Sequence, residues 1–222
     1  MQNIATFHSD KKLNINIWGP SYWYIIHLLA IRYTHKNSKL IYYFFKFLAC
    51  VLPCVKCQSP IDGYPFYFKT YNIKEYMTDN KKLFLWTYNL HNFVNKKTGK
   101  NFTMGPKETY QMFNRLGIKY NHFINFLINL SQICNKFKEE KCCTYINHII
   151  ANILFIIKEI IPEFGFYIET KHINNIKDAK DTKNIIYMIA DTIYNMKRAG
   201  VIDLKNIDFS QPGQEKCSSG CK

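Results

Sequence analysis

An all-α fold is predicted by three features of this 222-residue sequence. Apolar, aromatic and histidine side chains recur at helical spacing, as Trp23, His27 and Ile31 do at i, i+4 and i+8. Proline and glycine stand at the ends of such stretches, where they start or stop helices. The segments around a central cysteine pair also show the helical period, whereas a thioredoxin-like fold would need alternating strands and helices there.

Composition excludes several classes of protein. The chain can hold one large or two small domains, and with 47% hydrophobic and 16% aromatic residues it is not globally disordered. Its formal charge of +14 comes from 30 basic residues, of which only three are arginine, the better phosphate ligand, and they form no long run. We therefore expect incidental surface charge and no specific nucleic-acid partner.

The chain carries no sign of export. Residues 1–8 have no apolar core typical of a cleaved signal peptide, and the most apolar stretches, around 123–130 and 149–161, contain Asn, His or Lys. We expect a protein that is neither secreted nor membrane-spanning. Eight cysteines in such a chain favour redox chemistry or metal binding over a secreted disulfide framework.

Two helices are predicted before the cysteine pair. The first runs from Pro20 to about His35 after a turn at residues 18–21, and places Trp23 and His27 on one face. The second, from Lys39 to about Val51, is rich in Tyr and Phe.

The central motif is Cys54-Val55-Lys56-Cys57. Pro53 is typical of a first helical position, so a third helix is predicted to begin here and to be interrupted near residues 59–65. The helix dipole would then favour a thiolate on Cys54 by roughly 0.3–1 kcal/mol. From the motif alone three interpretations stay open: a redox disulfide, half of a zinc site, or two unrelated cysteines.

A fourth helix, about residues 82–98, carries polar groups on one face. Tyr88, His91 and Asn95 follow Phe84 at helical spacing, and Gly99 is the expected C-terminal cap. Buried polar groups need partners, so this face either binds a polar cofactor or is solvated. A short fifth helix, about 107–116, ends at Gly117.

The remaining sequence predicts amphipathic helices at 121–138, 144–161 and 182–199. His148 and His172 show no metal-ligand spacing, and we expect no metal site. The polar tail after residue 210 is rich in small residues and should be flexible.

Three motifs in sequence resemble the ERV/ALR-type FAD-linked sulfhydryl oxidases, most closely those encoded by large DNA viruses. They are Trp18-Gly19-Pro20-x-x-Trp23-x-x-x-His27, Pro53-Cys54-x-x-Cys57 and Trp86-x-x-x-x-His91-Asn92-x-Val94-Asn95-x-Lys97-x-Gly99-Lys100. The resemblance covers about residues 14–116. Two features depart from the family: its additional structural cysteine pair is absent, and Leu52 stands where an aromatic residue is common.

The resemblance implies a fold and a site. The fold is a four-helix bundle with a short fifth helix that binds FAD, here followed by an additional C-terminal helical domain. Cys54 and Cys57 would be the redox-active disulfide. The FAD-contacting positions implied by the family are Gly19, Trp23, His27, Tyr88, His91, Asn92, Asn95, Lys97 and Lys100.

It also implies a reaction. Substrate protein thiols would reduce the Cys54–Cys57 disulfide, and electrons would pass through FAD to O2, yielding hydrogen peroxide. Cys217 and Cys221, in the flexible tail, fit a shuttle disulfide. The alternative is a non-catalytic structural or zinc-binding helical interaction module.

The domains expected are an arm at 1–13, the oxidase domain at 14–118, a C-terminal helical domain at 119–209 and a tail at 210–222. The resemblance further implies a homodimer, and a viral protein acting on virion proteins in the host cytoplasm, at assembly sites or in the virion.

Overall fold

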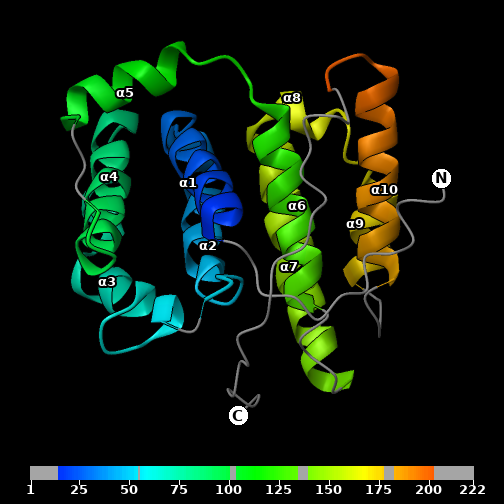
Figure 1. Cartoon of the computed structure of the whole chain (residues 1–222), viewed down its shortest axis with the longest axis horizontal. Helices are drawn as coiled ribbons and strands as arrows, with labels where there is room; N and C mark the ends of the chain where they lie inside the picture. The colour runs from blue at the N-terminus through cyan, green and yellow to red at the C-terminus, as the bar shows by residue number, and fades with distance from the viewer. Residues whose placement is uncertain (1–14, 55, 101–103, 135–139, 178–182, 203–222) are drawn as a thin grey trace.

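The computed structural model describes residues 15–54, 56–100, 104–134, 140–177 and 183–202, and all regular elements in these ranges are helical (Figure 1). The all-α prediction is therefore confirmed. The α-helices are α1 Ile15–Ile31, α2 Ser38–Leu48, α3 Tyr64–Thr70, α4 Asn80–Lys97, α5 Pro106–Arg115, α6 Tyr120–Cys134, α7 Glu140–Ile160, α8 Pro162–Gly165, α9 Thr170–Lys177 and α10 Lys183–Arg198. Three 3-10 turns, His35–Asn37, Lys56–Gln58 and Ile73–Glu75, lie between them.

The helix α1 is central to the arrangement. It packs against α4 on one side and α6 on the other, α2 contacts α7, and α7 contacts α9. Figure 1 shows α5 lying across the ends of α4 and α1, with the chain then crossing to α6. The expected boundary between residues 118 and 119 falls in that connection.

Side-chain contacts join the helices α1–α5 to the helices α6–α10. The ring of Tyr22 on α1 meets Phe126 on α6 edge-on at 4.8 Å, and the Tyr24 hydroxyl accepts a hydrogen bond from the backbone N–H of Lys119 at 2.8 Å. Arg32 pairs with Glu163 beyond the end of α1. One hydrophobic cluster includes buried residues from α1 through α10, so the C-terminal helices share a core with the first five.

The predicted start of the first helix was wrong. We expected a turn at residues 18–21, but α1 begins at Ile15 and continues through Pro20. A proline inside a helix costs about 3 kcal/mol because one hydrogen bond is lost. Burial of Trp18 and Tyr22, whose rings pack edge-on at 5.9 Å, offsets this cost at roughly 1.5–3 kcal/mol for each side chain. Pro20 itself faces solvent.

The predicted end of this helix was also too late. α1 ends at Ile31 rather than near His35. The Asn37 side chain binds the backbone on both sides of the break, accepting from the N–H of Thr34 at 2.9 Å and donating to the carbonyl of Arg32 at 2.9 Å. These local bonds replace the helical ones.

The caps of α4 follow ordinary rules. The Asp79 carboxylate accepts a hydrogen bond from the N–H of Lys82 at 2.8 Å, as an N-cap does. At the other end Gly99 adopts a left-handed φ of 69°, and the N–H of Lys100 reaches the carbonyl of Asn95 at 2.9 Å. The predicted glycine cap is confirmed.

The C-terminal half contains two helices that the sequence did not predict, α8 and α9. Both are short, of four and eight residues. Neither is long enough to show a sustained helical period, and helices of this length are held by packing rather than by propensity. Within the described residues, none of the helices combines the length and apolar character needed to cross a bilayer.

Candidate active site

The segment around the cysteine pair is a loop with a single 3-10 turn, Lys56–Gln58, so the predicted third helix starting at Pro53 is corrected. The next α-helix begins only at Tyr64. Pro60 disfavours the helical conformation at Ser59 and so prevents the turn from continuing. The chain then folds back at Gly63, where an added Cβ would lie 2.6 Å from the backbone oxygen of Cys57.

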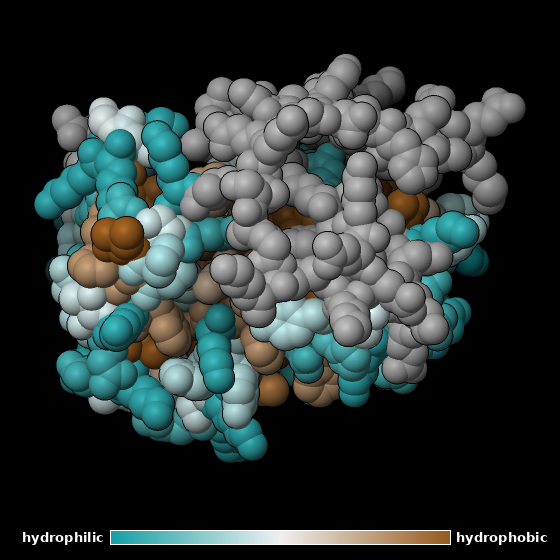
Figure 2. Space-filling model, turned by 90° about the horizontal axis from the view of Figure 1, so that it is seen from below, coloured by the Kyte–Doolittle hydropathy of each residue, from teal (hydrophilic) through white to brown (hydrophobic). Residues whose placement is uncertain are grey.

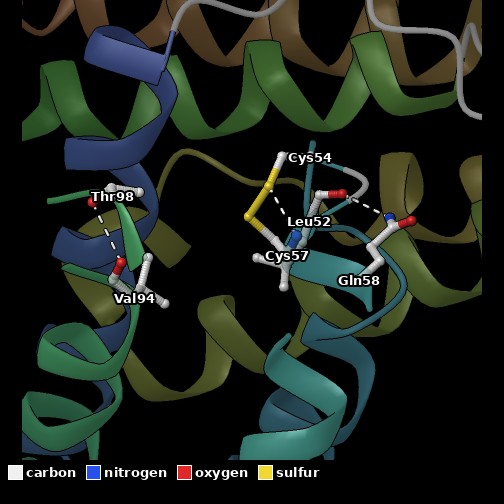
Figure 3. Close-up of a disulfide and its surroundings, with 6 residues drawn as sticks. All are labelled: Leu52, Cys54, Cys57, Gln58, Val94 and Thr98. Atoms are coloured by element: carbon white, nitrogen blue, oxygen red, sulfur yellow. Dashed lines mark hydrogen bonds between the residues drawn. A yellow bond between two sulfur atoms is a disulfide. The ribbon is translucent and has the colours of Figure 1, made fainter. Parts of the chain in front are cut away.

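Cys54 and Cys57 form a disulfide in this loop. The backbone N–H of Cys57 points at the Cys54 sulfur, with a nitrogen-to-sulfur distance of 3.0 Å (Figure 3). No helix dipole acts here, but after reduction this N–H would still stabilise a thiolate on Cys54 by a charge-assisted hydrogen bond. Both cysteines are only half-buried, which suits exchange with another thiol.

Two side chains hold the loop that leads to the disulfide. The buried Tyr22 hydroxyl donates to the carbonyl of Val51 at 2.7 Å. The Gln58 side-chain amide, one residue after the pair, donates to the carbonyl of Leu52 at 2.7 Å (Figure 3). The position of the disulfide is therefore determined by the hydrogen bonds of its flanks.

Replacing Tyr22 with phenylalanine should destabilise the fold by about 1–3 kcal/mol, because the buried carbonyl of Val51 loses its donor. Chemical denaturation measures the change. Tyr43→Phe on α2 is the control, since Tyr43 is 38% exposed and should give a change within about 0.5 kcal/mol. Equal stabilities of the two variants would contradict the role of Tyr22.

The loop after the disulfide is attached to the C-terminal end of α4. Asp62 pairs with Lys97 at 3.0 Å, and the Lys97 ammonium lies 4.6 Å from the ring centroid of Phe93. Figure 3 shows Val94 and Thr98, from the same end of α4, among the surroundings of the disulfide. The helix that carries His91 and Asn95 thus ends beside the loop that contains the Cys54–Cys57 disulfide.

Trp23, His27 and His91 come together between α1 and α4. The rings of Trp23 and His91 stack with centroids 3.9 Å apart and an interplanar angle of 11°. His27 Nε2 lies 3.2 Å from His91 Nδ1, and His27 Nδ1 lies 3.0 Å from the hydroxyl of Thr87. Thr87 was not predicted as a site residue, although it stands one helical turn before His91.

The hydrogen bonds of this cluster determine its tautomers. The Thr87 hydroxyl donates its single proton to the carbonyl of Phe84 at 2.8 Å, so it accepts from Nδ1–H of His27. A neutral His27 then accepts at Nε2 from Nδ1–H of His91. His91 consequently presents Nε2 as its acceptor nitrogen.

Burial keeps both imidazoles neutral. Desolvation, and then the nearby His91, lower the pKa of His27 well below its usual range. Desolvation first and the charge of Lys100 second lower the pKa of His91 to about 4. The neutral forms are the ones that the tautomer argument requires.

Acid should therefore destabilise the protein through His91. Its folded pKa of about 4 lies below the value of about 6.5 for an unfolded chain, so the unfolded state binds more protons as pH falls below 6.5. The stability that its neutral form contributes is present above pH 6.5 and lost toward pH 4. At pH 5 the loss is about 2 kcal/mol for this residue.

Denaturation at pH 7.5 and pH 5 tests this. His91→Gln should show a smaller drop between the two pH values than the wild type, and the exposed His35→Gln should show the wild-type drop. If the stability of His91→Gln depended on pH as that of the wild type does, the lowered pKa of His91 would be contradicted.

The other predicted cofactor positions lie on α1, on α4 or just after α4. The Tyr88 hydroxyl donates to the carbonyl of Met104 at 2.7 Å, and Gly19 is buried in α1. Asn92 and Asn95 are half-buried on α4, and within the described part of the chain neither side chain has a hydrogen-bond partner. Lys97 is paired with Asp62, and Lys100 is exposed. Cys217 and Cys221 lie outside the described residues.

These groups fit a cofactor with an aromatic ring system and polar substituents. A Trp–His stack offers flat apolar surface, and the side-chain amides of Asn92 and Asn95 offer donors and acceptors that a polar ligand would satisfy. Lys97 and Lys100, at the end of α4, supply positive charge for phosphate groups.

A second cluster of polar residues links α9 and α10. Nε2 of His172 lies 3.0 Å from a carboxylate oxygen of Asp191, and Glu169 is near enough to complete a three-residue group. Its geometry, which sequence spacing did not indicate, is accounted for by ordinary pairing, because Glu169 already binds Lys171 and Asp191 already accepts from His172 and Asn195.

Comparison with known proteins agrees with the resemblance seen in the sequence motifs. The Erv1 / Alr family model matches residues 20–113. A protein of Acanthamoeba polyphaga mimivirus is 34% identical over 95 residues, which are 40% of this chain and 64% of that protein. A protein of Invertebrate iridescent virus 3 is 27% identical over 88 residues, 38% of this chain and 57% of that protein.

Both relatives are named FAD-linked sulfhydryl oxidases, and both names mark the activity as inferred. The chain spans less than two thirds of the length of each. No solved structure matches this chain. The matched segment contains α2, α3, α4 and the cysteine pair, whereas α6–α10 lie beyond it.

Proposed function

We propose, because residues 20–113 match the Erv1 / Alr family model, that the chain is an FAD-linked sulfhydryl oxidase that forms disulfide bonds in protein thiols. The observation that carries the proposal is the Cys54–Cys57 disulfide, which lies in a loop joined to the end of α4 by the Asp62–Lys97 ion pair. The same helix carries His91, which stacks on Trp23.

The chemistry of the chain itself is thiol–disulfide exchange. A substrate thiolate attacks the sulfur of Cys54, the Cys54–Cys57 bond breaks, and Cys57 leaves as a thiolate. A second substrate thiolate then attacks the mixed disulfide, and Cys54 leaves. The substrate gains one disulfide, and two electrons and two protons remain on the Cys54–Cys57 dithiol.

The N–H of Cys57 assists the second step. It lies 3.0 Å from the Cys54 sulfur and stabilises the negative charge that develops there when Cys54 leaves. A better leaving thiolate makes this step faster, because exchange rates rise as the leaving group's pKa falls.

Residues from α1 and α4 would hold the FAD. Trp23 and His91 supply a stacking surface, His27 fixes the tautomer of His91, and Asn92 and Asn95 supply hydrogen bonds. Gly19, Tyr88, Lys97 and Lys100 complete the set that we propose. Bound FAD supplies the electron acceptor for the dithiol and the route to O2, which yields hydrogen peroxide.

The purified protein tests the proposal. It should be yellow with a flavin spectrum, consume O2 when given dithiothreitol, and produce hydrogen peroxide in equal amount. A colourless protein that contains zinc would overturn it in favour of a structural module.

Further parts of the proposal concern partners. We propose that the chain acts as a homodimer on thiol-containing virion proteins, in the host cytoplasm at assembly sites or in the virion. The similarity to proteins of two viruses supports the viral setting, and the homodimer is what the resemblance to the oxidase family implies. Size-exclusion chromatography with light scattering tests the oligomeric state.

Cys217 and Cys221 are proposed as a shuttle that carries electrons from bulky substrates to Cys54–Cys57. A tether gives such a dithiol an effective concentration of roughly millimolar at the site. The Cys217→Ser, Cys221→Ser double variant should oxidise dithiothreitol at the wild-type rate and a reduced protein substrate several-fold more slowly. Equal rates on the protein substrate would reject the shuttle.

A further inference from the structure

The turn that follows the disulfide, whose backbone at Gly63 packs against the backbone of Cys57, exposes an isoleucine. Ile61, four residues after Cys57, is 80% exposed. Pro60, before it, is exposed as well. Single exposed apolar residues are common on protein surfaces, so exposure alone does not indicate a binding surface. The rigidity of this turn, its apolar neighbours and its charge are the further features that do.

The turn is rigid. The Ser59 hydroxyl donates to the Asp62 carboxylate at 2.5 Å, and the N–H of Gly63 donates to the carbonyl of Ser59 at 2.8 Å. Asp62 is also held by Lys97 of α4 at 3.0 Å. No Cβ fits at Gly63, because the backbone of Ser59 would lie 2.6 Å from it. The side chain of Ile61 is therefore displayed by a fixed backbone, which lowers the entropic cost of binding to it.

Aromatic residues continue the surface from this turn. The Lys97 ammonium that pairs with Asp62 lies over the ring of Phe93, and Phe93 stacks with Phe66 of α3 at 6.3 Å. Phe66 is 37% exposed. Figure 2 views the molecule from the end where α3 lies in Figure 1, and hydrophobic residues are visible there among hydrophilic ones. We call Pro60, Ile61 and Phe66 the apolar rim.

The charge around the apolar rim is positive. Residues 56–70 and 93–100 contain one acidic residue, Asp62, and Asp62 is neutralised by Lys97. Apart from Lys97, which pairs with Asp62, and Lys100, which is proposed for the FAD phosphates, the exposed lysines in these segments are Lys56, Lys69 and Lys96. A segment of negative charge is attracted to such a surface, and one of positive charge is repelled.

From these observations we propose that the apolar rim is a docking surface for substrate polypeptides in which an apolar and an acidic residue flank the reactive cysteine. The proposal rests on the proposed oxidase function. The turn packs against the disulfide loop, since an added Cβ at Gly63 would lie 2.6 Å from the backbone oxygen of Cys57. An extended substrate advances about 3.3 Å per residue, so the neighbours of a substrate cysteine at Cys54 extend along this loop. Apolar contact with Ile61 and attraction to the lysines then favour such a segment.

The test uses the full-length flavoprotein and three dithiol peptides of one length that differ only in the residues flanking their cysteines. The flanks are Leu and Glu, Ser and Gln, or Leu and Lys. We expect kcat/KM to be about tenfold higher for the Leu/Glu peptide than for either other peptide, since an apolar contact and a nearby charge each contribute severalfold. The advantage over the Leu/Lys peptide should shrink at high salt.

Ile61→Ser should remove most of the preference for the Leu/Glu peptide over the Ser/Gln peptide. Phe166→Ser is the matched control, because Phe166 is 82% exposed but lies after α8. Both variants should oxidise dithiothreitol at the wild-type rate. Equal kcat/KM for Ile61→Ser and wild type on the Leu/Glu peptide, or equal use of the Leu/Glu and Leu/Lys peptides at low salt, would overturn the proposal.

A binding assay keeps this test separate from that of the oxidase activity. Peptides with both cysteines replaced by serine are labelled, and their Kd is measured by fluorescence anisotropy. The Leu/Glu version should bind more tightly to wild type and Phe166→Ser than to Ile61→Ser, whether or not the protein oxidises thiols. Equal Kd values for all three proteins would overturn the docking surface, whereas absent dithiothreitol oxidation would overturn only the proposed function.

Discussion

Replacement of either Cys54 or Cys57 with serine should reduce O2 consumption with dithiothreitol by at least about 1,000-fold, while FAD remains bound. Neither residual thiol can form the intramolecular disulfide that exchange with a dithiol requires. The measurement is the initial rate in an oxygen electrode, with the flavin absorbance of each variant recorded in parallel. Substantial turnover by either variant would contradict the mechanism.

Cys50→Ser is the matched control for these variants. Cys50 stands four residues before Cys54 and is half-buried, and its burial raises the pKa of its thiol. A thiol with a raised pKa is a poor nucleophile at neutral pH because little thiolate is present. The rate of Cys50→Ser should therefore equal that of the wild type, and a loss as large as that of Cys54→Ser would show that the central pair does not act alone.

The second large effect is expected from the face of α4. The His91→Ala, Asn95→Ala double variant should lose most of its flavin, because it removes the ring that stacks on Trp23 and one of the two half-buried amides. Its melting temperature should fall together with its flavin content, since a ligand that binds only the folded state stabilises that state. Flavin is measured by the absorbance of the purified protein, and melting by circular dichroism.

A pair with the same spacing on another helix provides the control. His148 and Asn152 of α7 also stand four residues apart, and the Asn152 amide donates a local hydrogen bond to the carbonyl of His148. The His148→Ala, Asn152→Ala variant should keep its flavin. Full flavin and an unchanged melting temperature in the α4 variant would show that the face has been assigned wrongly.

The sequence alone was sufficient for features that depend on local chemistry. Helical spacing placed Trp23 with His27, and His91 with Asn95, on shared faces, because the 3.6-residue period depends only on the backbone. Gly99 was identified as a cap because a left-handed residue is needed there, and its φ of 69° agrees. The motifs around Cys54 and Cys57 were enough to recognise a resemblance to the ERV/ALR-type oxidases, because they combine uncommon residues at fixed spacing.

Tertiary structure decided the features in which distant residues outweigh local preference. Pro20 predicted a helix start, yet α1 begins at Ile15 because burial of Trp18 and Tyr22 offsets the lost hydrogen bond. Pro53 predicted a helix at the cysteine pair, yet the turn at Pro60 and the close packing at Gly63 produce a loop.

The pairing of Thr87 with His27, and the ion pair that joins Asp62 to Lys97, lie equally beyond what the sequence could determine. Residues 60 and 35 positions apart meet only after the helices have packed. Local periodicity determines which residues share a helix face, but the contact between two faces is determined by the packing of the whole core.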